Sequence, residues 1–383
     1  MSGRTSRAES LSRDLLSHQA RALMSDLESR RSARRVPEFQ ERVRLSREEL
    51  VGQPAAISET LAHQQDQIRQ IAKAIAKDPP ARIYCVGCGD SYISALAARY
   101  AFEQLVRIPF VVIQALDYTR YYCGQTDAKT LIIALSSSGV VPRTAEALLK
   151  AKEMGAKTIG VTNTPDTPLT DLPTHHIMVR ARRMGGCPTQ ASTGAIAALF
   201  LFALELASEL HATPLALLQQ RRAELDNLPA LVADAITRFD EPMLQLAAKL
   251  KRNDCFFFAG GGPSFATAAF GAAKVKEMSQ DYAVAMPLEE YHHYDSLKQG
   301  EPLFLVSPKG LGDDRALDTA RDAHNVKGEL IILTDDPAEP LSSLADLLLS
   351  FPSMWEAWTP IPYVVPLQLF AVHLGASKPP SHG

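Results

Sequence analysis

The sequence has few of the features that mark specialised protein classes. Its 383 residues include two tryptophans and five cysteines, and an odd number of cysteines does not suit a disulfide framework. The longest apolar run, Ala195 to Ala207, has 13 residues and contains Glu205, whereas a membrane-spanning helix needs about 20 residues. We therefore expect no membrane partner. The polar N-terminus leads into no apolar signal core, which favours a cytoplasmic protein.

Charge of neither sign dominates the chain. Lysine and arginine number 40 against 43 acidic residues, for a formal net charge of −3. Nucleic-acid-binding domains usually carry a clear basic excess, so we expect no nucleic-acid partner. Hydrophobic residues make up 46% and charged residues 22%, which is typical of a globular protein with a large buried core. The length alone suggests two or three domains.

The chain repeats itself. Ile83 to Ser91 is an apolar run that ends in glycines and a serine, and Phe256 to Ser264 repeats this pattern 173 residues later. Two further pairs of segments match at displacements of 172 and 171 residues, namely Thr162–Leu169 with Thr334–Leu341 and Leu135–Gly139 with Val306–Gly310. Three landmarks at nearly one displacement indicate a duplicated domain.

Each copy alternates short apolar runs with helix-forming stretches, which is typical of a parallel sheet covered by helices on both faces. The predicted strands are Arg82–Val86, Thr130–Leu135, Thr158–Val161 and His176–Val179 in the first copy, and Cys255–Ala259, Leu303–Val306, Leu330–Leu333 and Leu347–Phe351 in the second. We predict an α/β fold with two tandem, doubly wound domains at residues 61–225 and 226–375. A helical N-terminal extension (1–60), which we expect to pack against a second subunit, and a short C-terminal tail (376–383) flank them.

Two loops at predicted strand ends are suited to holding an anion. Gly87 to Ser91 follows the first strand and opens a helix, and Ser136 to Gly139 follows the next strand, with Arg143 and Thr144 at the start of the following helix. Hydroxyl and backbone N–H groups at a helix N-terminus can hold a phosphate or a sulfonate. Serines also cap helices without any ligand. Two such loops on neighbouring strands favour an anion site.

These loops and the duplication resemble the sugar isomerase (SIS) domain family. The nearest likeness is to the isomerase half of glucosamine-6-phosphate synthase and to stand-alone relatives such as fructoselysine-6-phosphate deglycase. Ala191-Ser-Thr193, Lys274-Val-Lys-Glu277 and Glu290-Tyr-His-His293 also resemble family motifs. The resemblance implies a mainly parallel five-stranded sheet in each domain. It also implies aldose–ketose isomerisation of an anionic hexose or amino-hexose through an enediol, with no cofactor.

The resemblance also implies roles for individual residues. Glu277 would move the proton between sugar C1 and C2, and Lys274, three residues away on the same helix face, would stabilise the developing charge. His293 would assist ring opening, and in the family this histidine is commonly contributed by a neighbouring subunit, which implies a homodimer. The residues expected to bind the substrate are Cys88, Gly89, Asp90, Ser91, Ser136, Ser137, Ser138, Arg143, Thr144, Ala191 and Ser192.

Some positions depart from the family pattern. Val140 and Val141 replace the polar residues that usually follow the serine loop. Asp90 replaces a threonine, and a carboxylate there would repel a phosphate dianion. Arg143 can contact an anion through two hydrogen bonds or neutralise Asp90. We therefore expect a modified anion site whose ligand carries a phosphate or a sulfonate.

Two other functions stay open from the sequence. A deglycase would split a phosphorylated Amadori sugar–amine conjugate by similar proton movements and release a free amine. A non-catalytic sensor would bind a sugar phosphate without turnover. We expect no metal, because neither the Cys85-Val-Gly-Cys88 pair nor the acidic and histidine residues around His293 has a second ligand motif elsewhere.

Overall fold

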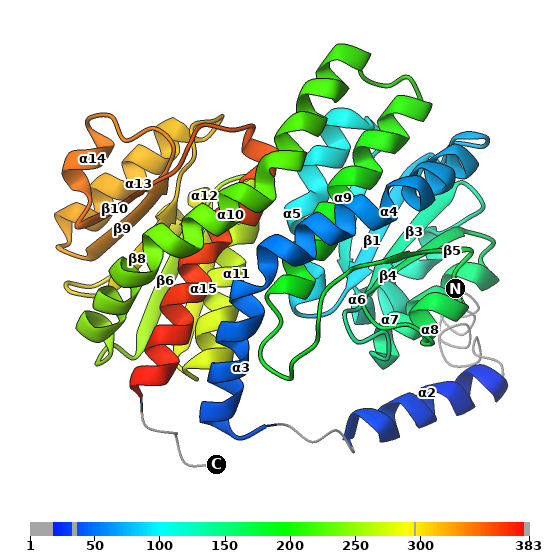
Figure 1. The fold of residues 1–383 in the computed structure, drawn as a ribbon, viewed down its shortest axis with the longest axis horizontal. Helices are drawn as coiled ribbons and strands as arrows, with labels where there is room; N and C mark the ends of the chain where they lie inside the picture. Colours follow the sequence, from blue (N-terminus) through cyan, green and yellow to red (C-terminus); the bar gives the residue numbers. More distant parts are fainter. Residues whose placement is uncertain (1–17, 33–36, 295, 379–383) are drawn as a thin grey trace, which may run out of the picture.

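The computed structural model describes residues 18–32, 37–294 and 296–378 and contains two α/β lobes side by side (Figure 1). The strands of the first lobe are Arg82–Gly87 (β1), Phe110–Gln114 (β2), Thr130–Leu135 (β3), Lys157–Thr162 (β4) and His175–Met178 (β5). Those of the second are Cys255–Gly260 (β6), Tyr282–Pro287 (β7), Pro302–Val306 (β8), Glu329–Thr334 (β9) and Leu347–Ser350 (β10). Both sheets are parallel, and their orders, β2-β1-β3-β4-β5 and β7-β6-β8-β9-β10, are equivalent. The predicted duplicated α/β fold is confirmed.

The strands form where apolar residues are covered on both faces. Every residue of β3 is buried, and in β6 only Cys255 is partly exposed. Successive side chains of a strand point to opposite faces, so complete burial requires helices on both sides of the sheet. β2 and β7, which the sequence analysis did not predict, lie at the sheet edges and keep several residues partly or fully exposed.

Helices cover both faces of each sheet. In the first half of the chain they are His18–Ser32 (α2), Phe39–Val51 (α3), Gln53–Ala76 (α4), Asp90–Leu105 (α5), Ala115–Asp117 (α6), Pro142–Glu153 (α7), Pro168–Asp171 (α8) and Gln190–Glu209 (α9). Then follow Leu215–Leu250 (α10), Pro263–Met278 (α11), Leu288–His293 (α12), Asp313–Asn325 (α13), Leu341–Leu344 (α14) and Pro360–Ser377 (α15). α4, α5 and α9 cover one face of the first sheet and α7 and α8 the other, while α10, α11 and α15 lie opposite α12 and α13 on the second.

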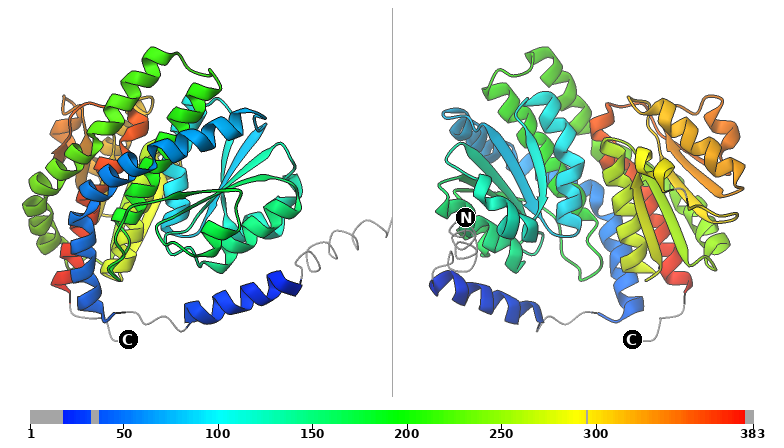
Figure 2. Two further views of the ribbon diagram at one scale, coloured as in Figure 1. Left: turned by 45° about the vertical axis from the view of Figure 1, so that its right-hand side comes forward. Right: turned by 180° about the vertical axis from the view of Figure 1, so that it is seen from behind.

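The largest apolar core lies between the two sheets and belongs to both lobes. It runs without a break from residues of β1 and β3 through the inner helices to β6 and β8. Phe258 and Phe304 stack within it, with ring centroids 4.7 Å apart. The buried amide of Gln53 donates to the side-chain oxygen of Gln368 at 2.8 Å, which joins α4 to α15. Figure 2 shows the inner helices between the sheets from two further sides.

The N-terminal extension is helical where the structure describes it. α3 packs against α15, and the Arg42 side chain donates to the backbone carbonyl of Glu277 at 2.7 Å. α3 therefore packs on the second lobe of its own chain, and contact of the extension with a second subunit stays a prediction. α2 lies against α7. Residues 1–17 and 33–36 of the extension and 379–383 of the tail lie outside the described residues.

The predicted domain boundaries fall inside continuous helices. Residues 60 and 61 both lie in α4, residues 225 and 226 in α10, and residues 375 and 376 in α15. These helices contribute to the core that the lobes share. The domain boundaries stay predictions, because each proposed boundary cuts a helix that packs in the core common to both lobes.

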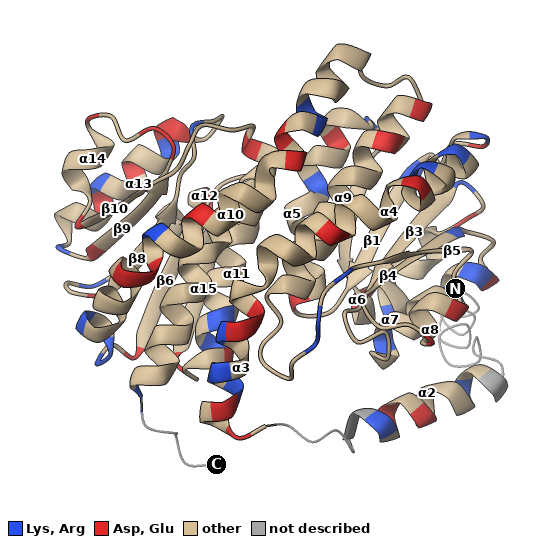
Figure 3. Cartoon of the chain, in the orientation of Figure 1, with Lys and Arg blue, Asp and Glu red and all other residues tan. Residues whose placement is uncertain are grey.

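One described helix, α9, is long and apolar enough to cross a membrane by length and composition. Its most apolar window is 89% buried inside the protein, as expected for a helix in the shared core. The outer surface is different in character. Figure 3 shows acidic and basic residues interspersed over both lobes, in keeping with the nearly balanced charge of the sequence.

Candidate functional site

Both predicted loops lie at the carboxyl edge of the first sheet. β1 ends at Gly87 and α5 begins at Asp90. Gly89 precedes α5 with φ of 54° and ψ of −129°, a backbone conformation that favours glycine. The serine loop, Ser136 to Gly139, follows β3 and leads into α7. Because β1 and β3 are neighbours in the sheet, the two loops open onto one space.

This space is a cavity of about 190 Å³. Its lining contains nine of the residues singled out from the sequence, namely Cys88, Asp90, Ser91, Ser136, Ser137, Ser138, Ala191, Ser192 and Glu277. The first eight come from the first lobe, and Glu277 comes from α11 of the second. The structure thus brings together a hydroxyl-rich loop and a carboxylate that are far apart in sequence. Gly89 shapes the start of α5 but does not itself line the cavity.

Lys274 connects the two lobes beneath the cavity. Its side chain is 0% exposed, and its ammonium donates to Glu277 Oε2 at 2.7 Å. The same ammonium donates to Asp90 at the start of α5. The Asp90 side chain is 13% exposed and that of Glu277 is 39% exposed, so Glu277 is the more accessible carboxylate. Lys274 therefore supports both carboxylates without lining the cavity itself.

The burial of this cluster changes its proton affinities. Burial raises the pKa of Asp90 to about 6, against the opposing effect of the Lys274 charge. Burial alone would lower the pKa of Lys274, but the charges of Asp90 and Glu277 outweigh it and raise that pKa above its usual value. Lys274 therefore stays charged between its two partners. Asp90 is close to the point at which it gains a proton near neutral pH.

The serine loop is held open by hydrogen bonds to its backbone. The hydroxyls of Thr162 and Thr164 donate to the carbonyl of Ser137 at 3.3 Å and 2.9 Å. Gly139 ends the loop with φ of 68°, and a Cβ there would lie 2.1 Å from Thr167 Oγ1. The buried hydroxyl oxygen of Ser136 has no hydrogen-bond partner among the described residues. Buried hydroxyls are normally paired, so this one is available to a ligand.

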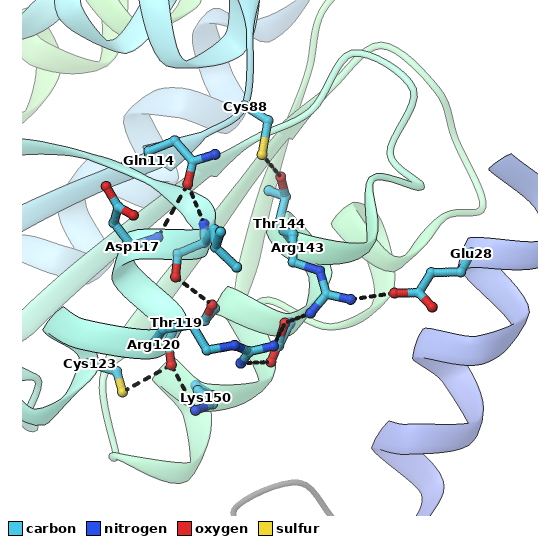
Figure 4. Close-up of polar contacts among 12 residues, drawn as sticks. Glu28, Cys88, Gln114, Asp117, Thr119, Arg120, Cys123, Arg143, Thr144 and Lys150 are labelled. Carbon is cyan, nitrogen blue, oxygen red and sulfur yellow. Dashed lines mark hydrogen bonds and ion pairs between the residues drawn. The ribbon is translucent and has the colours of Figure 1, made fainter. Parts of the chain in front are cut away.

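Arg143 and Thr144 do not line the cavity, contrary to expectation. Arg143 donates to Glu146 at 2.5 Å and also pairs with Glu28 of α2 (Figure 4). Glu146 is completely buried and attracts the guanidinium away from the loop. The neutralisation of Asp90 expected from Arg143 comes from Lys274 instead. Thr144 is buried, and its hydroxyl faces Cys88 Sγ at 4.0 Å (Figure 4).

His293 lies on α12, apart from this chain's own cavity lining. Its side chain is 65% exposed, and its Nε2 lies 3.5 Å from Glu289 Oε1. The single chain therefore does not bring His293 to Glu277. Contribution of His293 to the site of another subunit stays a prediction.

Several lining residues were not singled out from the sequence. Arg183 lines the cavity and is exposed, and it is the one basic residue in the lining among the residues that the structure describes. It follows β5 in a run with Arg180 and Arg182, so arginines after a strand end were the available signal. Asn163 follows β4 in the same way. The other lining residues that were not predicted to bind the substrate are Ser94, Leu135, Val141, Val161, Thr162, Val179, Pro188 and Ala195.

The five cysteines are free thiols. Cys85 is buried in β1, and burial raises the pKa of its thiol well above the usual value. In the described part of the chain, no group of three or more His, Cys, Asp or Glu side chains is arranged to hold a metal ion. The polar groups that line the cavity are hydroxyls, the carboxylates of Asp90 and Glu277, the Cys88 thiol, the Asn163 amide and the Arg183 guanidinium.

Sequence comparison finds the duplicated architecture in a known family. The SIS domain family model matches residues 77–209 and 249–378, together more than half of the chain. A glutamine–fructose-6-phosphate aminotransferase (isomerizing) from Thermococcus kodakarensis is 33% identical over 333 residues, covering 86% of this chain and 54% of that protein. The corresponding enzyme from Pyrococcus horikoshii is 28% identical over 333 residues, with the same coverage. The chain thus spans about half the length of these curated relatives.

Solved structures agree with this match. The C-terminal domain of glucosamine-fructose-6-phosphate aminotransferase from Francisella tularensis superposes with a TM-score of 0.78 and 25% identity, covering 86% of this chain and 95% of that one. A glucosamine-6-phosphate deaminase from Thermotoga maritima, 18% identical, covers 87% of this chain and 94% of that one with a TM-score of 0.66, a likeness of fold. These matches confirm the resemblance that the sequence motifs predicted.

Proposed function

Because the chain belongs to the SIS domain family, we propose that it is an aldose–ketose isomerase of an anionic hexose or amino-hexose. The observation that carries this proposal is the position of Glu277. This carboxylate, from the second lobe, lines the same cavity as the three serines that follow β3 in the first lobe. An anion seat and a candidate base in one cavity are what isomerisation of an anionic sugar requires.

In the proposed mechanism, the first lobe binds the anionic group of the sugar and the second lobe supplies the base. The serine loop and Ser91 hold the anionic group of the sugar through hydroxyl and backbone N–H donors. Glu277 removes a proton from one of the two carbons C1 and C2, and the carboxyl group, after its proton has exchanged with solvent, delivers a proton to the other carbon of the resulting enediol. Lys274, which donates to Glu277 at 2.7 Å, stabilises the negative charge that develops beside it.

The anionic group of the substrate is a phosphate or a sulfonate, and two lining residues bear on the choice. Asp90 contributes a carboxylate to the cavity, although Lys274 offsets its charge. Val141 contributes an apolar side chain that offers no hydrogen bond to the ligand. Both changes weaken the case for a dianionic phosphate relative to a singly charged sulfonate. We therefore include sulfonated hexoses such as sulfoquinovose among the substrates to be tested.

Solvent hydrogen exchange tests the proposed reaction directly. A thermal-shift screen over phosphorylated, sulfonated and Amadori sugars identifies a ligand, because a ligand that binds the folded state raises the melting temperature. That sugar is then incubated with the enzyme in D₂O, and NMR follows deuterium at C2. We expect exchange with the wild type and a loss of about 100-fold or more with Glu277→Gln.

Glu241→Gln is the matched control, because Glu241 is an exposed carboxylate on α10. It should exchange deuterium at the wild-type rate. Full exchange with Glu277→Gln would contradict the mechanism. Tight binding without exchange at any carbon would favour a sensor, and release of a free amine from an Amadori sugar would favour the deglycase.

We further propose a homodimer in which His293 acts in the partner's site. The exposure of His293 and its absence from the lining of its own chain's cavity support this arrangement. Glu277→Gln and His293→Ala chains, each inactive alone, are mixed under conditions that exchange subunits. Random pairing should restore about a quarter of wild-type activity, because half of the dimers then contain one intact site. No recovery in dimers shown to be mixed would contradict the shared site.

The proposal includes a cytoplasmic location. All five cysteines are free thiols, the form that thiols keep in a reducing compartment. Fractionation of cells that express the full-length protein checks this location. Recovery with secreted or membrane fractions would contradict it.

A further inference from the structure

The second lobe has a cavity of its own at the position equivalent to the first. It measures about 240 Å³ and lies at the carboxyl ends of β6 and β8. Gly262 starts α11 with φ of 51° and ψ of −127°, nearly the angles of Gly89 before α5. Ser264 and Ser307 line this cavity and correspond to Ser91 and Ser136 of the first. The duplication has therefore reproduced the geometry of the site as well as the fold.

The charge of this second cavity is opposite to that of an anion seat. Glu356 lines this cavity. Its carboxylate packs against Gly310, where an added Cβ would lie 2.5 Å from Oε2. The carboxylate also accepts a hydrogen bond from the backbone N–H of Leu311. No lysine, arginine or histidine is among the residues that line the cavity. In the second lobe, a carboxylate of the protein itself thus occupies the place that corresponds to the proposed anion site of the first lobe.

Among the described residues, Glu356 has no cationic partner. Over the described ranges it forms no ion pair, and Asp313 and Asp335 add further negative charge nearby. Burial raises the pKa of its carboxyl group, and both aspartates act in the same direction. A half-buried carboxylate without a counter-charge is unfavourable unless a cation joins it. This environment selects a positive ligand group.

The cavity also offers an unused hydroxyl. Ser264 is 2% exposed, and its buried hydroxyl oxygen has no hydrogen-bond partner in the part of the chain that the structure describes. Gln104 and Tyr100, from α5 of the first lobe, add a side-chain amide and an aromatic ring to the lining. Polar groups of this kind bind hydroxyls, while the ring and Leu288 cover an apolar face.

We propose that this second-lobe cavity binds a small polyhydroxylated primary amine, whose ammonium group pairs with Glu356 and whose hydroxyls bind Ser264 and Gln104. An unphosphorylated amino sugar has this chemistry. A metal ion has less support, since no cluster of three ligating side chains exists among the described residues. An anionic sugar is excluded by the carboxylate that fills its seat. The site is separate from the proposed isomerase site, so either can fail without the other.

Isothermal titration calorimetry with glucosamine tests the site, with glucose as the neutral control. We expect glucosamine to bind the wild type, and glucose to bind about tenfold more weakly or not at all, because it lacks the charge that pairs with Glu356. Glu356→Gln has nearly the same shape and should weaken glucosamine binding about tenfold or more. Ser264→Ala should weaken it less, about three- to tenfold. Glu241→Gln is the matched control and should bind normally.

Several outcomes would contradict the proposed amine site. These outcomes are no binding of glucosamine at tens of millimolar, equal binding of glucose, and binding that Glu356→Gln leaves unchanged in a protein with a normal melting temperature. Binding of magnesium chloride without any binding of glucosamine would also overturn it. If Glu356→Gln gained affinity for inorganic phosphate while the wild type bound no amine, the proposal would be wrong. Glu356 would then only occupy the position of a former anion site. Glu277→Gln should retain glucosamine binding, which separates this test from that of the isomerase.

Discussion

Lys274 provides the sharpest test of how the two lobes are joined. Its fully buried ammonium lies between Asp90 of the first lobe and Glu277 of the second. Lys274→Met keeps the length of the side chain but removes its charge, which leaves Asp90 buried without a partner. Removal of one member of a buried ion pair costs about 3–5 kcal/mol, because the remaining charge is uncompensated.

This loss should appear as a lower melting temperature. Unfolding entropy is about 2.1 cal/mol/K per residue, or about 0.8 kcal/mol/K for a cooperative chain of 383 residues, so we expect a decrease of about 4–6 °C. The shared core makes a single transition the expected behaviour. Differential scanning calorimetry measures the change. Lys276→Met, an exposed position on the same helix, is the matched control and should stay within about 0.5 kcal/mol of the wild type.

A second substitution tests the cause of that loss. Adding Asp90→Asn to Lys274→Met removes the uncompensated carboxylate, so the double variant should recover part of the stability, with a coupling energy of about 1–3 kcal/mol. A Lys274→Met protein as stable as the wild type would refute the reasoning. So would a double variant in which the two losses simply add.

Three other expectations concern the first lobe. Because burial raises the pKa of Asp90 to about 6, above its usual 3.8, the folded state binds this proton more tightly than the unfolded chain. The free energy of unfolding should therefore fall by up to about 3 kcal/mol as pH rises from about 4 to 6, and Asp90→Asn should flatten that part of a denaturation profile. Gly139→Ala forces a side chain into Thr167 at positive φ and should cost about 1–3 kcal/mol and raise KM, whereas Gly124→Ala, in open space, should do neither. Arg183→Ala should raise KM for the anionic substrate about tenfold. Arg143→Ala should lower the melting temperature, because the buried Glu146 loses one of its two arginine partners and keeps only Arg120. The reverse pattern would restore Arg143 to the anion site.

The repeat and the strand pattern were enough to predict the fold. Continuous apolar runs located four strands of each sheet, and the displacement between matching segments predicted the two lobes. β2 and β7 were not predicted, although Phe110–Ile113 and Tyr282–Met286 are apolar, because a short apolar run does not by itself distinguish a strand from a buried helix segment. Strand order places the serine loop beside the start of α5, so this part of the cavity also followed from local sequence.

Contacts between distant residues could not be predicted in the same way. Asp90 and Lys274 are 184 residues apart, and only the packing of α5 against α11 brings them together. Arg143 was assigned to the anion because it starts the helix after the serine loop. Its direction depends on the buried Glu146 and on Glu28 of α2, which sequence spacing does not reveal. Glu356 lies in the segment between β10 and α15 and lines the second cavity. This segment has no regular hydrophobic pattern from which its path could be predicted.

The placement of Glu277 has a consequence for the repeated halves of the chain. The first half supplies the serine loop that faces the cavity, and the second half supplies Glu277, the proposed base. Neither half made as a separate fragment would carry out the chemistry, although each contains a complete sheet. The two copies therefore have different roles in the proposed reaction. A chain made of two first halves or of two second halves would keep the duplicated fold but lack the proposed isomerase site.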